Sequence, residues 1–149
     1  MTYEPRIPAD PEYIALLGRA FYNYTYLEWV VVWTIVKLST DGFASVPMGK
    51  SSGYIAKALI KAIESTEPPL SPGLRRGLIA FHQEYLRSIA GRNKLLHSHP
   101  YTADGGLQRL RGGSHDWPDD AVISAAQQFE EAAIMGNGLF HGALAKERP

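Results

Sequence analysis

Residues Asp10–Leu38 read DPEYIALLGRAFYNYTYLEWVVVWTIVKL and predict one long helix around which the rest of the chain packs. Asp10 suits the N-cap and Pro11 the first turn, because proline lacks a donor that would have no partner there. A spacing that alternates between three and four residues is typical of a seam between packed helices. The inward positions of this seam are Ile14, Leu17, Phe21, Tyr24, Glu28, Val31, Ile35 and Leu38.

The second half of this segment is apolar almost all the way round. It carries additional apolar residues between the seam positions, namely Trp29, Val30, Val32, Trp33 and Val36. A helix of this kind must be covered on more than one side. The cover is either a second copy of the chain or other parts of its own core.

Two more helical segments follow, 52–65 and 72–96, with a pair of prolines between them that ends the first. Ser71 and Pro72 are suited to the cap and first turn of the second. After it, the turn residues within 101–113 predict a short hairpin or a long loop.

A final helix is predicted to start at Asp119, and the sequence Gly136-Asn137-Gly138 is predicted to kink, fray or end it. We therefore expect an all-α fold over a single domain, residues 1–149. Its architecture is a bundle of four main antiparallel helices, with the short hairpin or long loop before the last helix.

Composition limits the possible functions. The chain has 149 residues, of which 45% are hydrophobic and 20% charged, as in ordinary globular domains. Fifteen basic and fifteen acidic residues give a formal net charge of zero, so any contact with RNA must be local. There is no cysteine, which excludes disulfides and thiolate chemistry and fits a reducing compartment. Residues 1–6 do not resemble an export signal, and the most apolar window, 26–36, is too short to cross a bilayer. We expect a cytoplasmic protein without a membrane span.

The sequence RNKLLH at 92–97 places an arginine and a histidine at the end of the predicted helix 72–96. Histidine transfers protons near neutral pH, and arginine binds phosphate through a planar fork. Asn93 and His97 are one turn apart, with Arg92 beside them, so all three are candidates for one ligand site. Basic side chains in the last helical turn also stabilise the helix dipole, so a purely structural role is the alternative.

Arg92 lies on the core side of its helix. The inward spacing continues from Tyr85 through Ser88 to Arg92, and an unpaired charge in that position is costly. Glu28 presents the same problem with opposite sign on the first helix. We therefore expect Glu28 to meet Arg92 or His97 between the helices, where it would fix the arginine or hold one histidine tautomer.

These features resemble the HEPN superfamily of small all-helical domains. The resemblance rests on Arg92-Asn93 followed by His97 at the end of the third helix, on the aromatic first helix with Glu28, and on the four-helix layout. Some HEPN toxins have a tyrosine two residues after the histidine. Here that position is His99, and the nearest tyrosine is Tyr101.

The resemblance implies a metal-independent endoribonuclease, a hydrolase that works as a homodimer with two motifs facing one cleft. Arg92 would bind the scissile phosphate, His97 would transfer a proton and Asn93 would position them. The supporting residues would be Glu28, Ser88, His99 and Tyr101. The RNA 2′-hydroxyl would attack its own phosphate, which leaves a cyclic phosphate and a free 5′-hydroxyl. A toxin–antitoxin or phage-defence role, with a possible antitoxin partner, would fit this activity.

Two other interpretations stay open. A non-catalytic HEPN-like module would bind a nucleotide, RNA or protein partner through the same pocket, and the neutral charge favours it. A structural dimer would use Glu28 and Arg92 as a buried pair and bind nothing. The histidines at 97, 99 and 115 match no strong metal-ligand spacing, so we expect neither a metal nor a cofactor.

Overall fold

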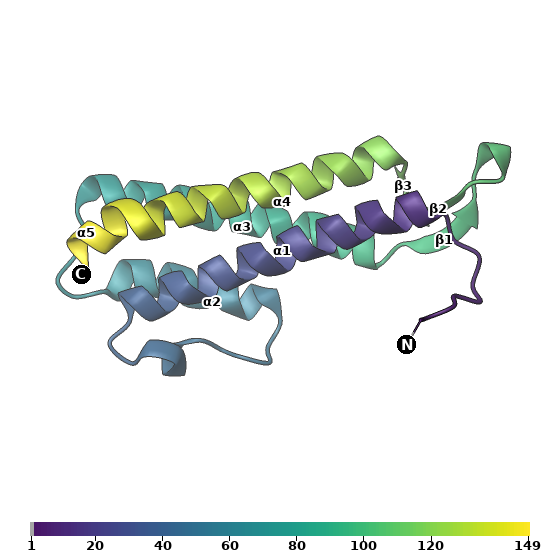
Figure 1. Cartoon of the computed structure of the whole chain (residues 1–149). Coiled ribbons are helices and arrows are strands. Elements are labelled where there is room, and N and C mark those ends of the chain that lie inside the picture. Colours follow the sequence, from purple (N-terminus) through teal and green to yellow (C-terminus); the bar gives the residue numbers. More distant parts are fainter. Residues whose placement is uncertain (1) are drawn as a thin grey trace.

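The computed structural model describes residues 2–149 and shows a mostly helical chain with one small sheet (Figure 1). Its main helices are α1 (Pro11–Leu38), α2 (Ser52–Ser65), α3 (Pro72–Leu96) and α4 (Asp119–Leu139). Shorter helical turns are η1 (Gly42–Ser45), η2 (Asp104–Gly106), η3 (Phe140–Leu144) and α5 (Ala145–Glu147). The strands β1 (His99–Thr102), β2 (Gln108–Gly112) and β3 (His115–Trp117) pair antiparallel in that order.

The starts of all four main helices are confirmed, as are the ends of the first three. The Asp10 carboxylate caps α1 by accepting the backbone N–H groups of Glu12 and Tyr13, at 3.0 and 3.5 Å. Caps and apolar periodicity act over one or two helical turns. This is why the sequence alone was sufficient to place these bounds.

The fold is mostly helical as expected, and a small sheet is added to it. Of the short hairpin or long loop expected within 101–113, the chain forms the hairpin, β1 with β2, and it adds a third strand, β3, which no local pattern indicated. Trp117 at the end of β3 is buried, and the hydroxyl of Tyr13 donates to its carbonyl oxygen at 2.7 Å. The strand is therefore held by a contact with the start of α1, more than one hundred residues earlier in the chain.

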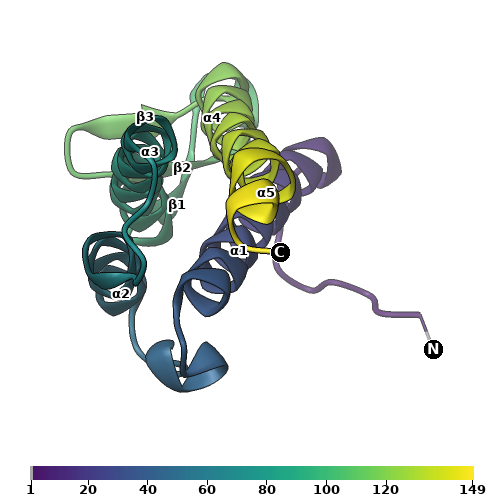
Figure 2. The same ribbon diagram turned by 90° about the vertical axis from the view of Figure 1, so that its left-hand side faces the viewer.

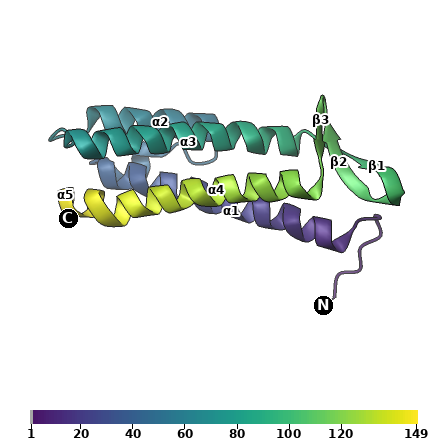
Figure 3. The same ribbon diagram turned by 90° about the horizontal axis from the view of Figure 1, so that it is seen from above.

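The helices form two layers, α2 with α3 and α1 with α4 (Figures 2 and 3). They are not all antiparallel, which corrects the expected arrangement. Tyr13 contacts Trp117 just before α4, whereas Tyr26 contacts Asn137 near its end, so α1 and α4 run in the same direction.

Helix α2 also runs parallel to α1. Glu28 accepts a hydrogen bond from Ser52 at the start of α2, and the carbonyl of Leu38 accepts one from Thr66 just past its end. The linker 39–51 carries the chain back to the middle of α1 before α2 begins. Of these four helices only α3 runs in the opposite direction, because the short connection 66–71 and the sheet segment 97–118 reverse the chain at opposite ends of the bundle.

Helix α2 covers only the second half of α1 (Figure 1). As a result Ile14 and Phe21, which were expected to face inward, are 50% and 58% exposed. At about 1.5 Å per residue, the 14 residues of α2 are half as long as the 28 of α1 and cannot reach them. The later seam positions, Val31 and Ile35, are fully buried as expected.

The core lies between the four main helices and continues under the sheet. It is made of large apolar side chains from every main helix. The largest fully buried members are Tyr85, Phe81, Phe129, Leu27, Ile35, Leu59, Leu78 and Leu144.

Helix α4 passes straight through the glycines at 136 and 138, where a kink, fraying or an end was expected. It continues to Leu139 and then into the π-helical turn η3. Gly136 is buried against Phe81 and Val30, so α4 is pinned there by packing with α3 and α1. Tertiary contact thus outweighs the low helix propensity of glycine.

We expect Gly136→Ala to destabilise the protein by about 1–3 kcal/mol. The added Cβ would overlap Cζ of Phe81 and lie 2.8 Å from Cγ1 of Val30, so these buried side chains or the helices that carry them must shift. Gly138→Ala is the matched control, because its Cβ meets nothing within 4 Å and the gain in helix propensity should stabilise by about 0.5–1 kcal/mol. Urea unfolding of both variants measures the difference; equal effects would contradict the close approach.

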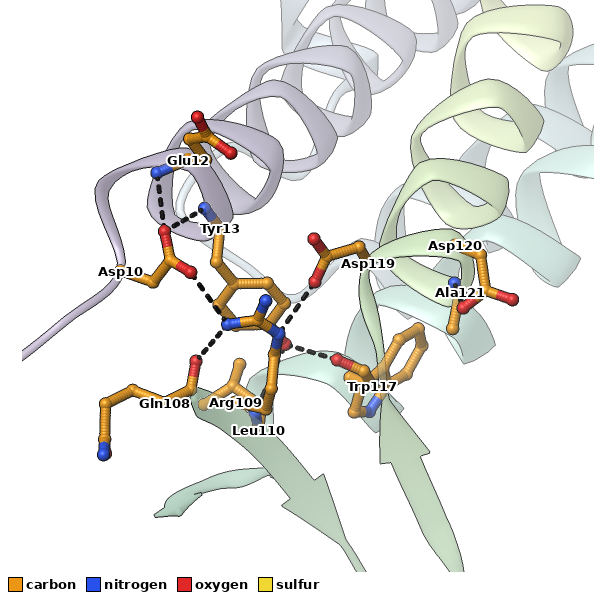
Figure 4. A network of polar contacts seen from close by, with 10 residues as sticks. All are labelled: Asp10, Glu12, Tyr13, Gln108, Arg109, Leu110, Trp117, Asp119, Asp120 and Ala121. Carbon is orange, nitrogen blue, oxygen red and sulfur yellow. Dashed lines mark hydrogen bonds and ion pairs between the residues drawn. The ribbon is translucent and has the colours of Figure 1, made fainter. Parts of the chain in front are cut away.

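A buried arginine joins the sheet to both helix starts (Figure 4). Arg109 of β2 contacts Oδ2 of Asp10 through Nη1 at 3.2 Å and Oδ1 of Asp119 through Nε at 2.7 Å. Its guanidinium carbon lies 4.5 Å from the centre of the Tyr13 ring. One side chain thus ties the first turn of α1 to the first turn of α4.

Acid should weaken this contact. The hydrogen bond from Arg109 holds the pKa of Asp10 below its usual value of 3.8. The pKa of Asp10 is lower in the folded state than in the unfolded state, where it has its usual value of 3.8. The stabilisation is therefore complete above pH 3.8 and is lost as the pH falls through the folded-state pKa. We expect Asp10→Asn, which still caps a helix, to be less stable than wild type at pH 7 and to approach it at pH 3. Urea midpoints measure this, with Asp104→Asn on η2 as the exposed control; a constant gap would contradict it.

Between residues 2 and 149, no helix combines the length and the apolar character that a bilayer crossing requires.

Candidate functional site

Glu28 lies at the centre of a polar cluster between α1, α2 and α3. Its Oε2 accepts hydrogen bonds from Oγ of Ser52 at 2.5 Å and from the hydroxyl of Tyr85 at 2.6 Å. The single proton of the Tyr24 hydroxyl has two acceptors within reach, Oγ of Ser52 at 2.7 Å and Oε2 of Glu28 at 3.2 Å. Ser52 and Tyr85 are buried, and Tyr24 is 4% exposed. A carboxylate with this many hydroxyl donors is held rigidly in an otherwise apolar interior.

Arg92 binds the same hydroxyl groups from the other side. Its Nη2 donates to Oγ of Ser52 at 2.6 Å and to the hydroxyl of Tyr24 at 3.3 Å, and its guanidinium carbon lies 4.8 Å from the centre of the Tyr24 ring. Both of these bonds use Nη2. Within residues 2–149, Nε of Arg92 is buried without a hydrogen-bond partner.

The expected meeting of Glu28 and Arg92 therefore takes an indirect form. No ion pair within 4.0 Å joins them among residues 2–149; the Ser52 hydroxyl stands between the two charges and bonds to both. Ser52 donates its one proton to Glu28 and accepts from Arg92. This Ser52–Glu28 relay holds the guanidinium of Arg92 in place, although Arg92 forms no direct ion pair with Glu28.

The two phenols act as permanent donors. Burial raises the pKa of Tyr85, and the hydrogen bond to the Glu28 carboxylate raises it further. Burial also raises the pKa of Tyr24. Both hydroxyl groups thus stay protonated at physiological pH, so neither serves as a general base there.

The other residues of the Arg-to-His motif lie outside this cluster. His97 is the C-cap of α3; its backbone N–H donates to the carbonyl of Asn93 at 3.0 Å, and its side chain is exposed. Asn93 is half-buried on the last turn of the helix. Within residues 2–149, neither a hydrogen bond nor an ion pair joins His97 to Glu28.

The three remaining supporting residues are also separate from the Glu28 cluster. Ser88 is fully buried and accepts a hydrogen bond from Gln128 at 2.9 Å, so it joins α3 to α4. His99 is exposed at the start of β1. Tyr101 lies under the guanidinium of Arg111, 4.0 Å from ring centre to carbon, on the sheet.

Arg92 lies at the edge of an apolar groove of about 440 Å³. The groove lies beside the first half of α1, which α2 does not cover. Its walls come from α1, the end of α3 and β2, and include Ile14, Leu17, Phe21, Leu96 and Leu110. A positive group beside apolar walls suits a ligand that has an anionic part and a flat or apolar part.

Sequence reasoning missed the residues that connect Glu28 to Arg92. Tyr24 is four residues before Glu28 and so on the same helix face, a signal that was available. Tyr85 occupies an inward position on α3, where burial was expected but a polar role was not. Ser52 had no signal, because the parallel course of α2 brings it to Glu28.

Among residues 2–149, no three histidine, aspartate or glutamate side chains are grouped as ligands of a metal ion. No protein-family model, curated protein or solved structure matches this chain. What the site does must therefore be inferred from its residues and their geometry.

Proposed function

We propose that this protein is a metal-independent endoribonuclease of the HEPN type that works as a homodimer, as a toxin or a phage-defence component. The observation that carries the proposal is the guanidinium of Arg92, which the Ser52–Glu28 relay holds at a groove while Nη1 makes no hydrogen bond to the described chain. A fixed guanidinium with unused donors is suited to bind a phosphate.

The position of His97 supports a role in proton transfer. Its side chain is exposed at the end of the same helix, only five residues after Arg92. Histidine is the side chain that most often serves as a general acid or base in catalysis. Asn93 lies one turn before His97 on the same side of α3, so it is placed to orient a ligand that His97 also contacts.

The spacing on the helix supports the homodimer. Five residues correspond to a rise of about 7.5 Å and a rotation of about 140°, so Arg92 and His97 of one copy point to different sides. Two copies that place their α3 ends at a common cleft supply both groups to one phosphate. A possible antitoxin partner would act by covering that cleft.

The proposed reaction is transesterification within RNA. The 2′-oxygen attacks the adjacent phosphorus and loses its proton, while the bond from phosphorus to the 5′-oxygen breaks and that oxygen gains a proton. His97 transfers a proton and Arg92 stabilises the charge that develops on the phosphate. The products are a cyclic phosphate and a 5′-hydroxyl, and only RNA has the required 2′-hydroxyl.

A second candidate is a non-catalytic module that binds a nucleotide or an RNA end in the same groove. The mainly apolar walls around Arg92 favour it, since they suit a base better than a long run of phosphates. The formal net charge of zero favours it as well. In that case nucleotides raise the melting temperature and RNA stays intact.

The deciding experiment is incubation of a mixed RNA with the purified protein in excess chelator, with the product ends identified. We expect cyclic-phosphate and 5′-hydroxyl ends, and no cleavage of a DNA of the same sequence. Intact RNA together with thermal stabilisation by nucleotides would reject the nuclease and support the binding module.

A further inference from the structure

A second cavity lies between the second half of α1 and the end of α4, and its volume is about 390 Å³. We call it the aromatic pocket. Its lining includes Tyr26, Trp29 and Trp33 of α1, Asn137 of α4, and Phe140 and His141 of η3. No residue that lines it also lines the groove at Arg92. The two cavities are therefore separate sites.

The two walls of the aromatic pocket follow the parallel course of α1 and α4. Nδ2 of Asn137 donates to the hydroxyl of Tyr26 at 2.9 Å and joins the helices at one end of the pocket. One and two turns further along α1 come Trp29 and Trp33, and one turn beyond Asn137 comes Phe140. The pocket thus has its polar groups at one end and aromatic rings along both sides.

The aromatic rings are held in place by edge-to-face contacts. The ring centres of Trp29 and Trp33 are 5.8 Å apart with an angle of 82° between the planes, and those of Phe140 and His141 are 5.0 Å apart with an angle of 80°. Trp33 also meets the ring of Phe43 at 5.1 Å. Even so, Trp29 is 47% exposed and Trp33 is 40% exposed, although aromatic side chains gain most from burial. A flat ring inside the pocket would cover them.

One wall is formed by the π-helical turn η3, which follows α4 directly. Turns of this kind are rare and are found frequently at functional sites. Their hydrogen bonds join residues i and i+5, so the turn is wider than an α-helical one. In η3 two consecutive residues, Phe140 and His141, line the same pocket, while Leu144 at its end is fully buried in the core. The irregular turn therefore shapes the pocket.

The polar pair at the end of the pocket leaves one donor and one acceptor for a ligand. The Tyr26 hydroxyl accepts from Asn137, so its own proton is available, and within residues 2–149 no hydrogen bond uses Oδ1 of Asn137. If the amide turns by 180°, the hydroxyl donates to Oδ1, and the hydroxyl oxygen and Nδ2 become the acceptor and the donor. Either arrangement is complementary to a carbonyl group beside an N–H group. A lactam ring carries these two groups on one edge.

The lining of the aromatic pocket carries no formal charge. Among the residues that the structure describes, no lysine, arginine, aspartate or glutamate contributes to it. A phosphate group therefore has no counter-charge there, in contrast with the groove at Arg92. Apolar and aromatic walls with a few placed polar groups are the usual form of a small-molecule site. The ligand that fits these walls is neutral and flat.

We propose that the aromatic pocket binds a neutral, planar heterocycle through a lactam edge, the N–H and C=O pair that uracil, guanine and flavin rings share. The Tyr26 hydroxyl donates to the carbonyl oxygen of the ligand, and Oδ1 of Asn137 accepts from its N–H. Trp29 and Phe140 cover the faces of the ring. The inference goes beyond the proposed function, because this second site neither includes Arg92 nor requires RNA cleavage.

Calorimetric titration of the purified protein with uridine, guanosine and riboflavin tests the proposal and distinguishes the sources of the ring. We expect at least one of them to bind, and the tightest identifies a nucleoside or a flavin as the ligand. The form methylated at the lactam nitrogen should bind about 10-fold more weakly, because it lacks the N–H that Asn137 accepts. Failure of all three to bind, or equal binding of the methylated form, would overturn the proposal.

Substitutions locate the bound ring. Tyr26→Phe removes the donor but keeps the aromatic ring, so we expect about 10-fold weaker binding. Tyr22→Phe is the matched control, because Tyr22 is 62% exposed on the same helix and lies outside the pocket, and its binding should equal that of wild type. Trp29→Ala removes a stacking surface and should weaken binding by about 5- to 150-fold, with melting curves to verify that the variant is folded.

Arg92→Lys separates this site from the groove at Arg92. We expect ring binding to be unchanged in this variant, because Arg92 does not line the aromatic pocket. Binding that falls with Arg92→Lys and not with Tyr26→Phe would place the ligand in the other groove and overturn the proposal. Titration requires no RNA, so failure of the nuclease assay and failure of ring binding are independent results.

Discussion

Replacement of His97 by alanine is expected to lower the rate of RNA cleavage by about 10²- to 10⁴-fold, the usual contribution of one general acid–base group. The side chain is exposed and makes no hydrogen bond within the described residues, so folding should be unaffected. His115→Ala is the matched control, because His115 is also exposed but lies on β3. Initial rates on one RNA, with melting curves for each variant, give the comparison.

Arg92→Lys separates phosphate binding from charge. Lysine keeps the positive charge but lacks the planar fork, so it cannot present one nitrogen to Ser52 and a second nitrogen to a phosphate, as the guanidinium can. We expect about 10²- to 10³-fold slower cleavage, the cost of losing one donor to the developing charge. If the rates of the His97→Ala and Arg92→Lys proteins match that of wild type, neither residue takes part in the reaction.

Removal of the Glu28 carboxylate should cause the largest loss of stability in the helical part of the fold. In Glu28→Ala the hydroxyl groups of Ser52 and Tyr85 lose their acceptor, and Arg92 loses the only carboxylate in its cluster. Unpaired buried donors cost about 1–3 kcal/mol each, and Ser52 and Tyr85 are two of them. Because Glu28 itself is half-buried, we expect a total of about 3 kcal/mol.

Glu28→Gln and Glu84→Ala make this prediction specific. Glutamine keeps an acceptor oxygen but no charge, so it should lose about half as much as alanine. Glu84 pairs with the mostly exposed Arg87 on α3, and surface pairs of this kind contribute about 0–1 kcal/mol. Urea unfolding of the three variants provides the order. A Glu28→Ala loss no larger than that of Glu84→Ala would show that the cluster is not an anchor.

The same series distinguishes the structural interpretation of the cluster from the functional one. If Glu28 and Arg92 serve stability alone, Arg92→Lys lowers the unfolding free energy and His97→Ala changes nothing in any assay. If Arg92 also binds phosphate, cleavage or nucleotide binding falls further than the loss of stability accounts for. Comparing the two quantities at a temperature where every variant is folded separates these cases.

The sequence predicted those parts of the fold that depend on neighbours within one or two helical turns. The starts of the helices follow from local caps such as Asp10, and the buried seam from Tyr24 to Leu38 follows from periodicity. The core side of Arg92 followed from the same spacing, and so did the presence of Glu28 among buried residues. These signals are local, because hydrogen bonds and side-chain contacts within a helix span three or four residues.

Tertiary structure alone decided the direction of the helices, the third strand and the partners of Glu28. The linker 39–51 returns the chain to the middle of α1, and this turns α2 parallel and brings Ser52 between Glu28 and Arg92. It also leaves Ile14 and Phe21 exposed, although they follow the same periodicity as the buried positions. Periodicity shows which side of a helix is apolar, but whether that side is covered depends on the length and path of other segments, which no local pattern contains.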